Sequence, residues 1–111
     1  MQTRRDEFDE FVLDAAARLE STCGRAFPTV EFAVEDVPRG PAPWDRREVP
    51  LARLYPAMPS RPARIVIYRR PVETRAPGPP DLAALVADVV TEQVAALLGV
   101  RPEELDPNYG E

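Results

Sequence analysis

The chain contains no histidine, no lysine and only one cysteine, Cys23. Histidine is the commonest general base, the commonest zinc ligand and the side chain that titrates near neutral pH, so its absence removes all three. A single cysteine can neither form a disulfide within the chain nor supply a metal site built on several thiolates. We therefore predict no catalytic residue, no metal ligand and no cofactor, and a location in the reducing cytoplasm.

Long apolar runs are also missing. No stretch reaches the roughly 18 consecutive apolar residues that a membrane span needs, and the opening segment MQTRRDEFDEF lacks the apolar centre of a signal peptide. The sequence has no glycine-rich phosphate loop and no Ser-His-Asp arrangement. We expect a soluble protein that does not contact a membrane.

The length and the apolar content suit one small folded unit. The chain has 111 residues, of which 44% are hydrophobic. This is enough for one core and too little for two domains. We predict a single domain that spans residues 1–111.

The first periodic segment predicts an amphipathic helix that begins at Thr3 and ends before Gly24. Thr3 and Asp6 have the spacing of a capping box, in which each side chain accepts a hydrogen bond from the other's backbone. Apolar residues at helical spacing form one stripe: Phe8, Phe11, Val12, Ala15, Ala16 and Leu19.

Three segments predict strands. Residues 29–36, TVEFAVED, alternate apolar and polar side chains, which is typical of a strand with one buried face. Residues 48–55 predict a second strand, and Pro50 favours an edge position because proline cannot donate to a neighbouring strand. Residues 63–70, ARIVIYRR, hold an unbroken apolar run, which predicts a central strand covered on both faces.

Proline-rich loops separate these strands, at residues 37–47 and 56–62. Trp44 lies in the first loop, and we expect it to pin that loop to the core rather than to bind a ligand.

A long helix follows the turn-rich residues 76–80, with Asp81 as its expected N-cap and Gly99 as its C-terminal stop. Its apolar stripe comprises Leu82, Leu85, Val86, Val89, Val90, Val94 and Leu97. Residues 101–105 permit one short further turn with Pro102 near its start. The predicted fold is α+β, with an N-terminal helix, a mixed sheet of about three strands, and a long C-terminal helix packed on the sheet.

Five segments carry a resemblance to a known family: FDEFVLDAAARL, VEFAVEDVP, LARLY, RIVIYRRPV and LVADVVTEQVAALLGVRPEEL. In this order they resemble the minimal zincin-like metallopeptidase family of bacteria. The resemblance implies a compact α+β domain whose last long helix carries His-Glu-x-x-His, followed by x-x-Gly-x-x-Asp.

Aligning Gly99 with the family glycine places four residues of this chain on the family's site. Glu92 stands for the first histidine, Gln93 for the catalytic glutamate, Ala96 for the second histidine and Pro102 for the aspartate ligand. A catalytic zinc needs at least three protein ligands, and of the three ligand positions, 92, 96 and 102, only Glu92 keeps a donor atom. Gln93 has no carboxylate to take a proton. We call these four residues the vestigial positions.

Shifting the alignment by one residue does not restore the site. Thr91 then takes the place of the first histidine and Glu92 that of the glutamate, but Ala95 takes that of the second histidine and Gly99 is misaligned. Neither alignment yields a zinc peptidase.

Glu92 and Gln93 each have an ordinary interpretation and a functional one. Gln93 lies near the middle of the apolar stripe, so we expect its amide to be buried and hydrogen-bonded, with a ligand contact as the alternative. Glu92 lies at the border of the stripe, where we expect it to be solvated, with pairing to an arginine of the central strand as the alternative.

Charge is unevenly distributed along the chain, whose net charge is -5. Residues 53–75 hold six arginines and one glutamate, whereas residues 76–111 hold seven acidic residues and one arginine. The simplest interpretation is pairing between neighbouring elements. The alternative is a patch for an acidic partner, comprising Arg53, Arg61, Arg64, Arg69 and Arg70, with nucleic acid disfavoured by the net negative charge and the lack of interleaved aromatics.

The leading hypothesis is an inactive zincin-like protein that acts by binding, with a protein as the expected partner. One alternative is a hydrolase with a carboxylate metal site formed by Glu92, Glu104 and Asp106, which would suit Mg²⁺ or Ca²⁺ better than Zn²⁺. A second alternative is small-molecule binding in a residual cleft.

Overall fold

A computed structural model describes residues 2–39 and 49–110. In chain order the elements are α1 (Arg4–Cys23), a 3-10 turn (Gly24–Ala26), β1 (Val30–Glu35), β2 (Ala52–Tyr55), β3 (Ala63–Tyr68), α2 (Arg69–Arg75), α3 (Pro79–Leu98) and α4 (Pro102–Leu105). The fold is α+β, as the sequence predicts. Trp44 lies outside the described residues, so its expected role is not tested.

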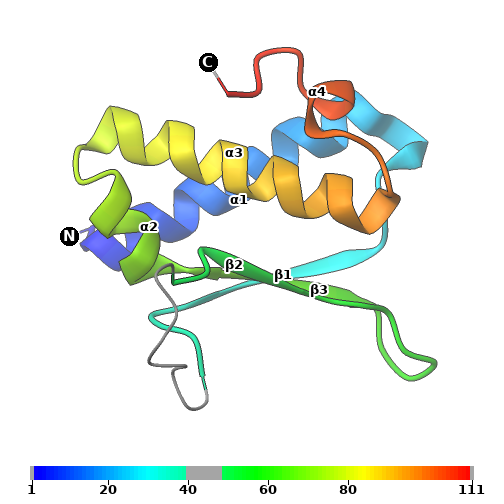
Figure 1. The fold of residues 1–111 in the computed structure, drawn as a ribbon, viewed down its shortest axis with the longest axis horizontal. Coiled ribbons are helices and arrows are strands. Elements are labelled where there is room, and N and C mark those ends of the chain that lie inside the picture. The colour runs from blue at the N-terminus through cyan, green and yellow to red at the C-terminus, as the bar shows by residue number, and fades with distance from the viewer. Residues whose placement is uncertain (1, 40–48, 111) are drawn as a thin grey trace.

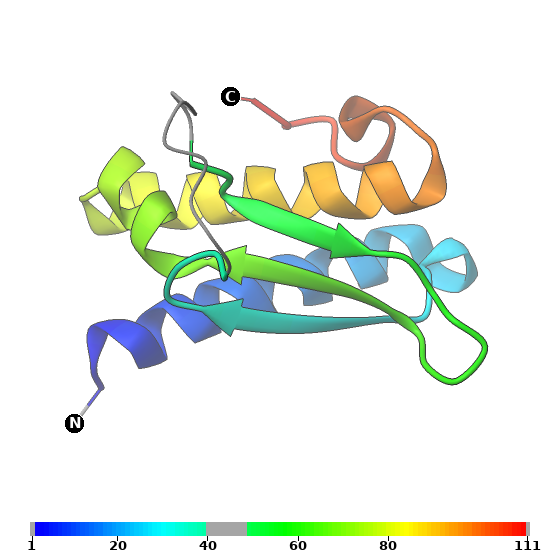
Figure 2. The ribbon, with the colours of Figure 1, turned by 60° about the horizontal axis from the view of Figure 1, so that its bottom comes forward.

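The molecule has two layers, with α1 and α3 side by side on one face of a three-stranded sheet (Figure 1). The strand order is β1-β3-β2, with β1 parallel and β2 antiparallel to β3 (Figure 2). The sheet is therefore mixed, β3 is central and β2 is an edge strand, as predicted. The core lies between the layers, where Ile65 and Ile67 of β3 meet Phe8 of α1 and Val86 and Val90 of α3.

Local signals in the sequence place most element ends correctly. Thr3 and Asp6 form the expected capping box at the start of α1. Gly99 ends α3 with a φ of 73°, a left-handed conformation that favours glycine, and the short turn at residues 102–105 is α4.

Two expectations about helix starts are wrong. Asp81 is not the N-cap of α3, because the helix begins at Pro79 with Gly78 as N-cap, and Asp81 lies in the first turn. The first turn accepts Pro79 and Pro80 since its N–H groups have no partner within the helix. The third strand ends at Tyr68 rather than Arg70, because α2 begins at Arg69.

The second face of β3 is buried without a helix over it among the described elements. Val66 and Tyr68 are only 2% and 3% exposed, although α1 and α3 lie on the other face (Figure 1). Val66 lies opposite Arg53 in the register, and the Arg53 guanidinium stacks over the Tyr55 ring at 4.9 Å from its centroid. Long side chains thus cover part of this face, and β3 is buried on both faces, as its apolar run predicts.

No helix among the described residues is long and apolar enough to cross a membrane.

Candidate functional site

The vestigial positions of α3 lie on its solvent side. Glu92 and Ala96, one helical turn apart, are both exposed, and Gln93 is half-buried. The expected burial of Gln93 is therefore wrong. The apolar stripe is rotated toward α1, so that Thr91 and Ala95 are buried instead. Thr91 is the buried polar residue of this helix, and its hydroxyl donates to the Ala87 carbonyl at 2.8 Å.

Glu92 has a specific partner from the C-terminal tail, residues 106–110. The Tyr109 hydroxyl donates a hydrogen bond to Glu92 Oε2. This hydrogen bond to the carboxylate raises the pKa of Tyr109 from 10.0 to about 12, because it favours the protonated phenol. Glu92 is exposed, as expected, and the alternative of an arginine partner from the central strand is not observed, since a tyrosine from the tail takes that place.

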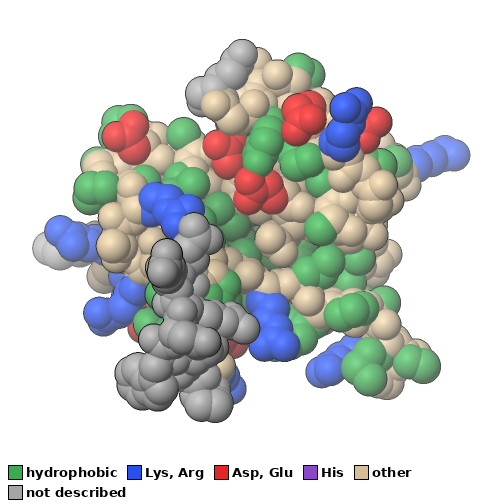
Figure 3. Space-filling model, viewed as in Figure 1, with side chains coloured by type: hydrophobic (Ala, Val, Ile, Leu, Met, Phe, Trp, Pro, Cys, Tyr) green, Lys and Arg blue, Asp and Glu red, His purple; other side chains and the backbone are tan. Residues whose placement is uncertain are grey.

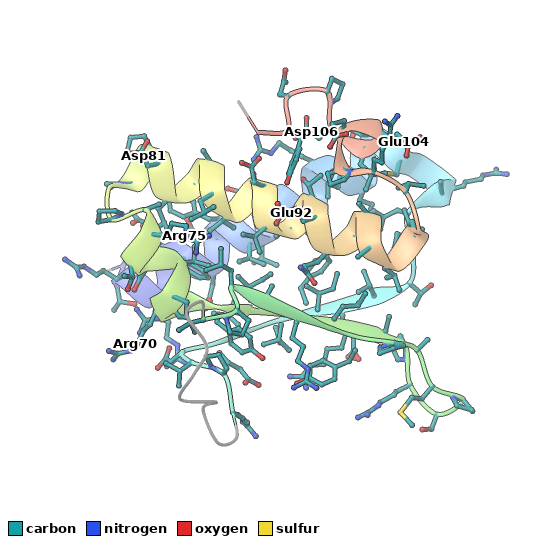
Figure 4. The ribbon with its side chains drawn as sticks, in the orientation of Figure 1. Arg70, Arg75, Asp81, Glu92, Glu104 and Asp106 are labelled. Atoms are coloured by element: carbon teal, nitrogen blue, oxygen red, sulfur yellow. The ribbon has the colours of Figure 1, made fainter. Side chains whose placement is uncertain are left out.

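A second contact holds the tail across α3. The Gly110 N–H donates to Asp88 Oδ1 at 3.3 Å, one helical turn before Glu92. Inside the tail, the Asn108 N–H donates to Asp106 Oδ1 at 2.9 Å, and the Tyr109 N–H donates to the Asp106 carbonyl at 3.0 Å. The tail is thus a hydrogen-bonded turn whose last two described residues, Tyr109 and Gly110, attach to carboxylates of α3, and Figure 4 shows it above Glu92.

The vestigial positions do not fit a zinc ion. Ala96 and Pro102 carry no donor atom, and the Glu92 carboxylate accepts the Tyr109 hydroxyl instead of facing other ligands. Gln93 is an amide and cannot act as a general base. One carboxylate is too few protein ligands for a catalytic zinc ion.

The proposed carboxylate site for Mg²⁺ or Ca²⁺ is not assembled either. Within residues 2–39 and 49–110, no three His, Cys, Asp or Glu side chains form a group that could hold a metal ion. Glu104 instead accepts a hydrogen bond from the Arg101 N–H at 2.7 Å, which caps α4. Asp106 is engaged within the tail, and Figure 4 shows Glu92, Glu104 and Asp106 on three different segments.

The five arginines of the predicted acidic-partner patch are divided between two places. Arg53 and Arg64 project from the outer face of the sheet, the face away from the helices, because their neighbours Leu54 and Ile65 face the core. Arg61, in the turn between β2 and β3, is also exposed and donates to the Met58 sulfur at 3.3 Å.

Arg69 and Arg70 begin α2 and play different parts. Arg69 is engaged in two ion pairs, 3.1 Å from Asp36 and 2.9 Å from Glu73, and its side chain is only 14% exposed. The Arg69 guanidinium lowers the pKa of Asp36 by hydrogen bonding to its carboxylate. Arg70 is exposed, and its backbone N–H donates to the Asp36 carbonyl at 3.0 Å. Arg69 therefore joins the end of β1 to α2 and is not available to a partner.

The hollows of the described surface include two on opposite layers of the fold. One, of about 180 Å³, lies on the outer face of the sheet near Glu31, Tyr55, Arg61 and Arg64. The other, of about 520 Å³, lies between α1, α3 and the tail, near Arg18, Asp88, Thr91 and Asn108. None of the vestigial positions lines either hollow, so neither is a remnant of a cleft at those positions.

Within residues 2–39 and 49–110 no strand pairs with the outer edge of β2, and this edge carries backbone groups directed away from the sheet. The Tyr68 N–H donates to the Leu51 carbonyl at 2.9 Å, which makes Leu51 and Tyr68 a hydrogen-bonded pair. Antiparallel strands alternate such pairs with non-bonded ones, so Arg53 faces β3 through its backbone, whereas Ala52 and Leu54 direct their N–H and C=O groups outward. The sequence predicted an edge strand from Pro50. It did not predict which backbone groups point outward, because this depends on the register between β2 and β3.

Tyr109 was likewise absent from the sequence-based candidates. It lies in a turn-rich tail without apolar periodicity, so no local pattern connects it with α3. Tyr109 is seventeen residues away from Glu92 in the sequence. The turn at Gly99 and α4 reverse the chain and bring the two side chains together.

Residues 28–111 match the family model of zincin-like metallopeptidases. The match covers β1 to the tail, and thus includes all four vestigial positions. No curated protein matches the chain.

Proposed function

Because the chain belongs to the zincin-like metallopeptidase family, we propose that it is a member without peptidase activity that binds an extended segment of a protein partner along the edge of β2. Two observations carry this proposal. The vestigial positions lack the residues that peptide hydrolysis needs, and the outer edge of β2 presents N–H and C=O groups that can bind an extended chain.

The lack of activity follows from the side chains at the vestigial positions. Peptide hydrolysis by a zincin needs a metal ion that activates a water molecule and a base that takes its proton. Gln93 supplies no base, and Ala96 and Pro102 supply no ligand. The Tyr109 hydroxyl donates to the remaining carboxylate, that of Glu92, and so occupies part of its accepting capacity.

Binding along β2 follows from the backbone. An extended chain that pairs with a free strand edge gains main-chain hydrogen bonds from the N–H and C=O groups of Ala52 and Leu54. Arg53 projects from the same strand to the outer face of the sheet. An acidic side chain on the bound segment, placed opposite Arg53, would add a favourable cross-strand pair. We therefore favour partners with extended, acidic segments.

The cytoplasm is the location that we propose for this binding. The one thiol of the chain, Cys23, is unpaired and half-buried, which suits a reducing compartment.

The test uses random linear peptides displayed on phage, selected against the purified chain, with the affinity of the best peptide then measured by calorimetry. Ala52→Pro removes an outward N–H and leaves the ladder with β3 intact, so it should keep the fold and weaken the peptide by at least tenfold. Arg53→Pro is the matched control, because it removes an N–H that faces β3 and should lower the melting temperature.

Two results would contradict the proposal. One is the absence of any selected peptide, and the other is a peptide whose affinity is unchanged by Ala52→Pro while circular dichroism shows a folded variant. Hydrolysis of a selected peptide by the wild-type chain would contradict the inactivity.

A further inference from the structure

The exposed arginines of residues 53–64 and the acidic residues of 81–106 lie on different sides of the molecule. Exposed arginines gather on the outer face of the sheet and in the turn after β2, at Arg53, Arg61 and Arg64. The acidic residues of α3, α4 and the tail lie on the helix side, where Figure 3 shows carboxylates gathered and Figure 4 labels Asp81, Glu92, Glu104 and Asp106. The molecule is therefore electrically polarised across its two layers.

The arginines of the first range and the carboxylates of the second do not form ion pairs with each other among the described residues. The ion pairs of the described residues join Arg5 and Arg69 to Asp36, Arg69 to Glu73, and Arg39 to Glu35. None of them joins residues 53–75 to the described residues after 75. The expected pairing between these neighbouring segments is thus not observed in the part of the chain that the structure describes.

Each surface keeps an excess of one sign. On the outer sheet face, Glu31 and Glu35 oppose the arginines, but Glu35 is also paired with Arg39 at 3.5 Å. On the helix side, Arg101 is the single base among the acidic residues after position 75. The acidic set comprises Asp81, Asp88, Glu92, Glu103, Glu104 and Asp106.

We propose that the outer sheet face of one copy binds the acidic helix side of a second copy. The partner is identified by charge complementarity, because the chain itself presents both of the matching surfaces. The contact joins two different surfaces, so it is heterologous, and repeated use builds rows or closed rings rather than a twofold dimer. This contact does not involve the backbone edge of β2 and does not depend on the binding function proposed above.

The net charge of -5 opposes this contact only weakly at moderate salt. At about 0.1 M salt the Debye length is about 10 Å, which is shorter than every dimension of the molecule, 37 × 32 × 29 Å. Charges on the far side are therefore screened, while opposite charges brought within a few ångströms still attract. At about 1 M salt the Debye length falls to about 3 Å, and the contact is weakened throughout.

The experiment measures the weight-average mass by sedimentation equilibrium over a wide range of protein concentrations. At about 0.1 M salt the wild-type mass should rise with concentration above the monomer mass of 12.4 kDa, and at about 1 M salt it should return to it. Two paired variants each disable one surface. Arg61→Glu with Arg64→Glu makes the outer sheet face acidic, whereas Asp81→Arg with Glu103→Arg leaves the helix side nearly neutral, with four carboxylates and three arginines. Each should be monomeric alone.

Mixing the two variants gives the decisive result. Each of them keeps one native surface, so an equal mixture should form a one-to-one complex of twice the monomer mass and nothing larger. The matched control, Arg4→Glu with Arg25→Glu, makes the same change in net charge as the first variant at exposed residues outside both surfaces, and it should associate like the wild type.

The proposal is overturned if the wild-type chain stays at 12.4 kDa at every concentration. It is also overturned if association survives about 1 M salt, if the control abolishes association, or if the mixed variants remain monomeric while circular dichroism shows them folded.

Discussion

The hydrogen bond from Tyr109 to Glu92 changes the chemistry of both side chains. It places a neutral donor on the one vestigial position that keeps a carboxylate, and it raises the pKa of Tyr109 to about 12. The folded-state pKa lies above the ordinary value of 10.0, so folding favours the protonated phenol. The stabilisation is fully present below pH 10 and is lost as the pH rises through about 12.

We predict that ultraviolet titration of the tyrosines will show a transition near pH 12 that is absent from Tyr109→Phe. Glu92→Gln should move this transition back toward 10, because the amide lacks the charge that opposes ionisation. Glu103→Gln is the matched control, since Glu103 makes the smallest contribution to the raised pKa and its removal should have little effect. A transition that Glu92→Gln leaves in place would show that the contact is not formed in solution.

Gln93 gives a second prediction at the scale of one residue. It is half-buried, and no buried side-chain nitrogen or oxygen atom of the described residues lacks a hydrogen-bond partner, so its amide is not a stranded polar group. Gln93→Leu should therefore change the free energy of unfolding by less than about 0.5 kcal/mol in urea denaturation. A loss of more than about 1 kcal/mol would reveal a buried hydrogen bond of this amide.

At the scale of elements, the two sides of α3 have different roles. One side of the helix builds the core through Val86, Val90 and Val94, and the other presents Glu92 and Ala96 to solvent. Because the core side does not depend on the solvent side, ligand residues can be lost from the helix without loss of the fold.

The same separation predicts that the ligand set can be restored. Glu92→His, Gln93→Glu, Ala96→His and Pro102→Asp together should recover zinc binding, since positions 92 and 96 project from the same side of α3. Two imidazoles at this spacing can each approach a zinc ion to about 2.0 to 2.1 Å. Metal affinity should return more readily than peptidase activity, because residues that orient the ligands have also to be in place.

Calorimetric titration with zinc measures the outcome, and circular dichroism verifies the fold. The control variant keeps Ala96 and carries the other three substitutions, and it should bind zinc at least tenfold more weakly. A folded fourfold variant without zinc affinity would show that the alignment through Gly99 is wrong, or that the tail closes the site.

At the scale of the whole molecule, stability should not depend on zinc. The core between the sheet and the two long helices is built from apolar side chains apart from Thr91, whose hydroxyl donates to the Ala87 carbonyl, and the vestigial positions lie outside it. We predict that elemental analysis of the dialysed protein will find far less than one zinc ion per chain. A chelator should leave the melting temperature unchanged within about 1 °C. A tightly held zinc ion, or a melting temperature lowered by the chelator, would contradict a lost site.

The sequence by itself determined those features that depend on short-range chemistry. The capping box at Thr3 and Asp6, the strand alternation in β1 and the left-handed stop at Gly99 each involve residues within one or two turns of one another. Pro50 favoured an edge position, and β2 is an edge strand, although it begins at Ala52, two residues after Pro50. The identities at positions 92, 93, 96 and 102 were enough to show that zinc ligands are missing.

Only the tertiary structure decided which side of α3 is buried and what contacts its exposed side. Thr91 rather than Gln93 enters the interior because α3 packs against both α1 and the sheet, and the apolar stripe is broad enough to rotate between them. The partner of Glu92 is Tyr109, which approaches through a chain reversal that no periodicity encodes. The placement of the arginines and the acidic residues on opposite layers likewise follows from strand register and helix packing, because long-range positions depend on how whole elements fit together.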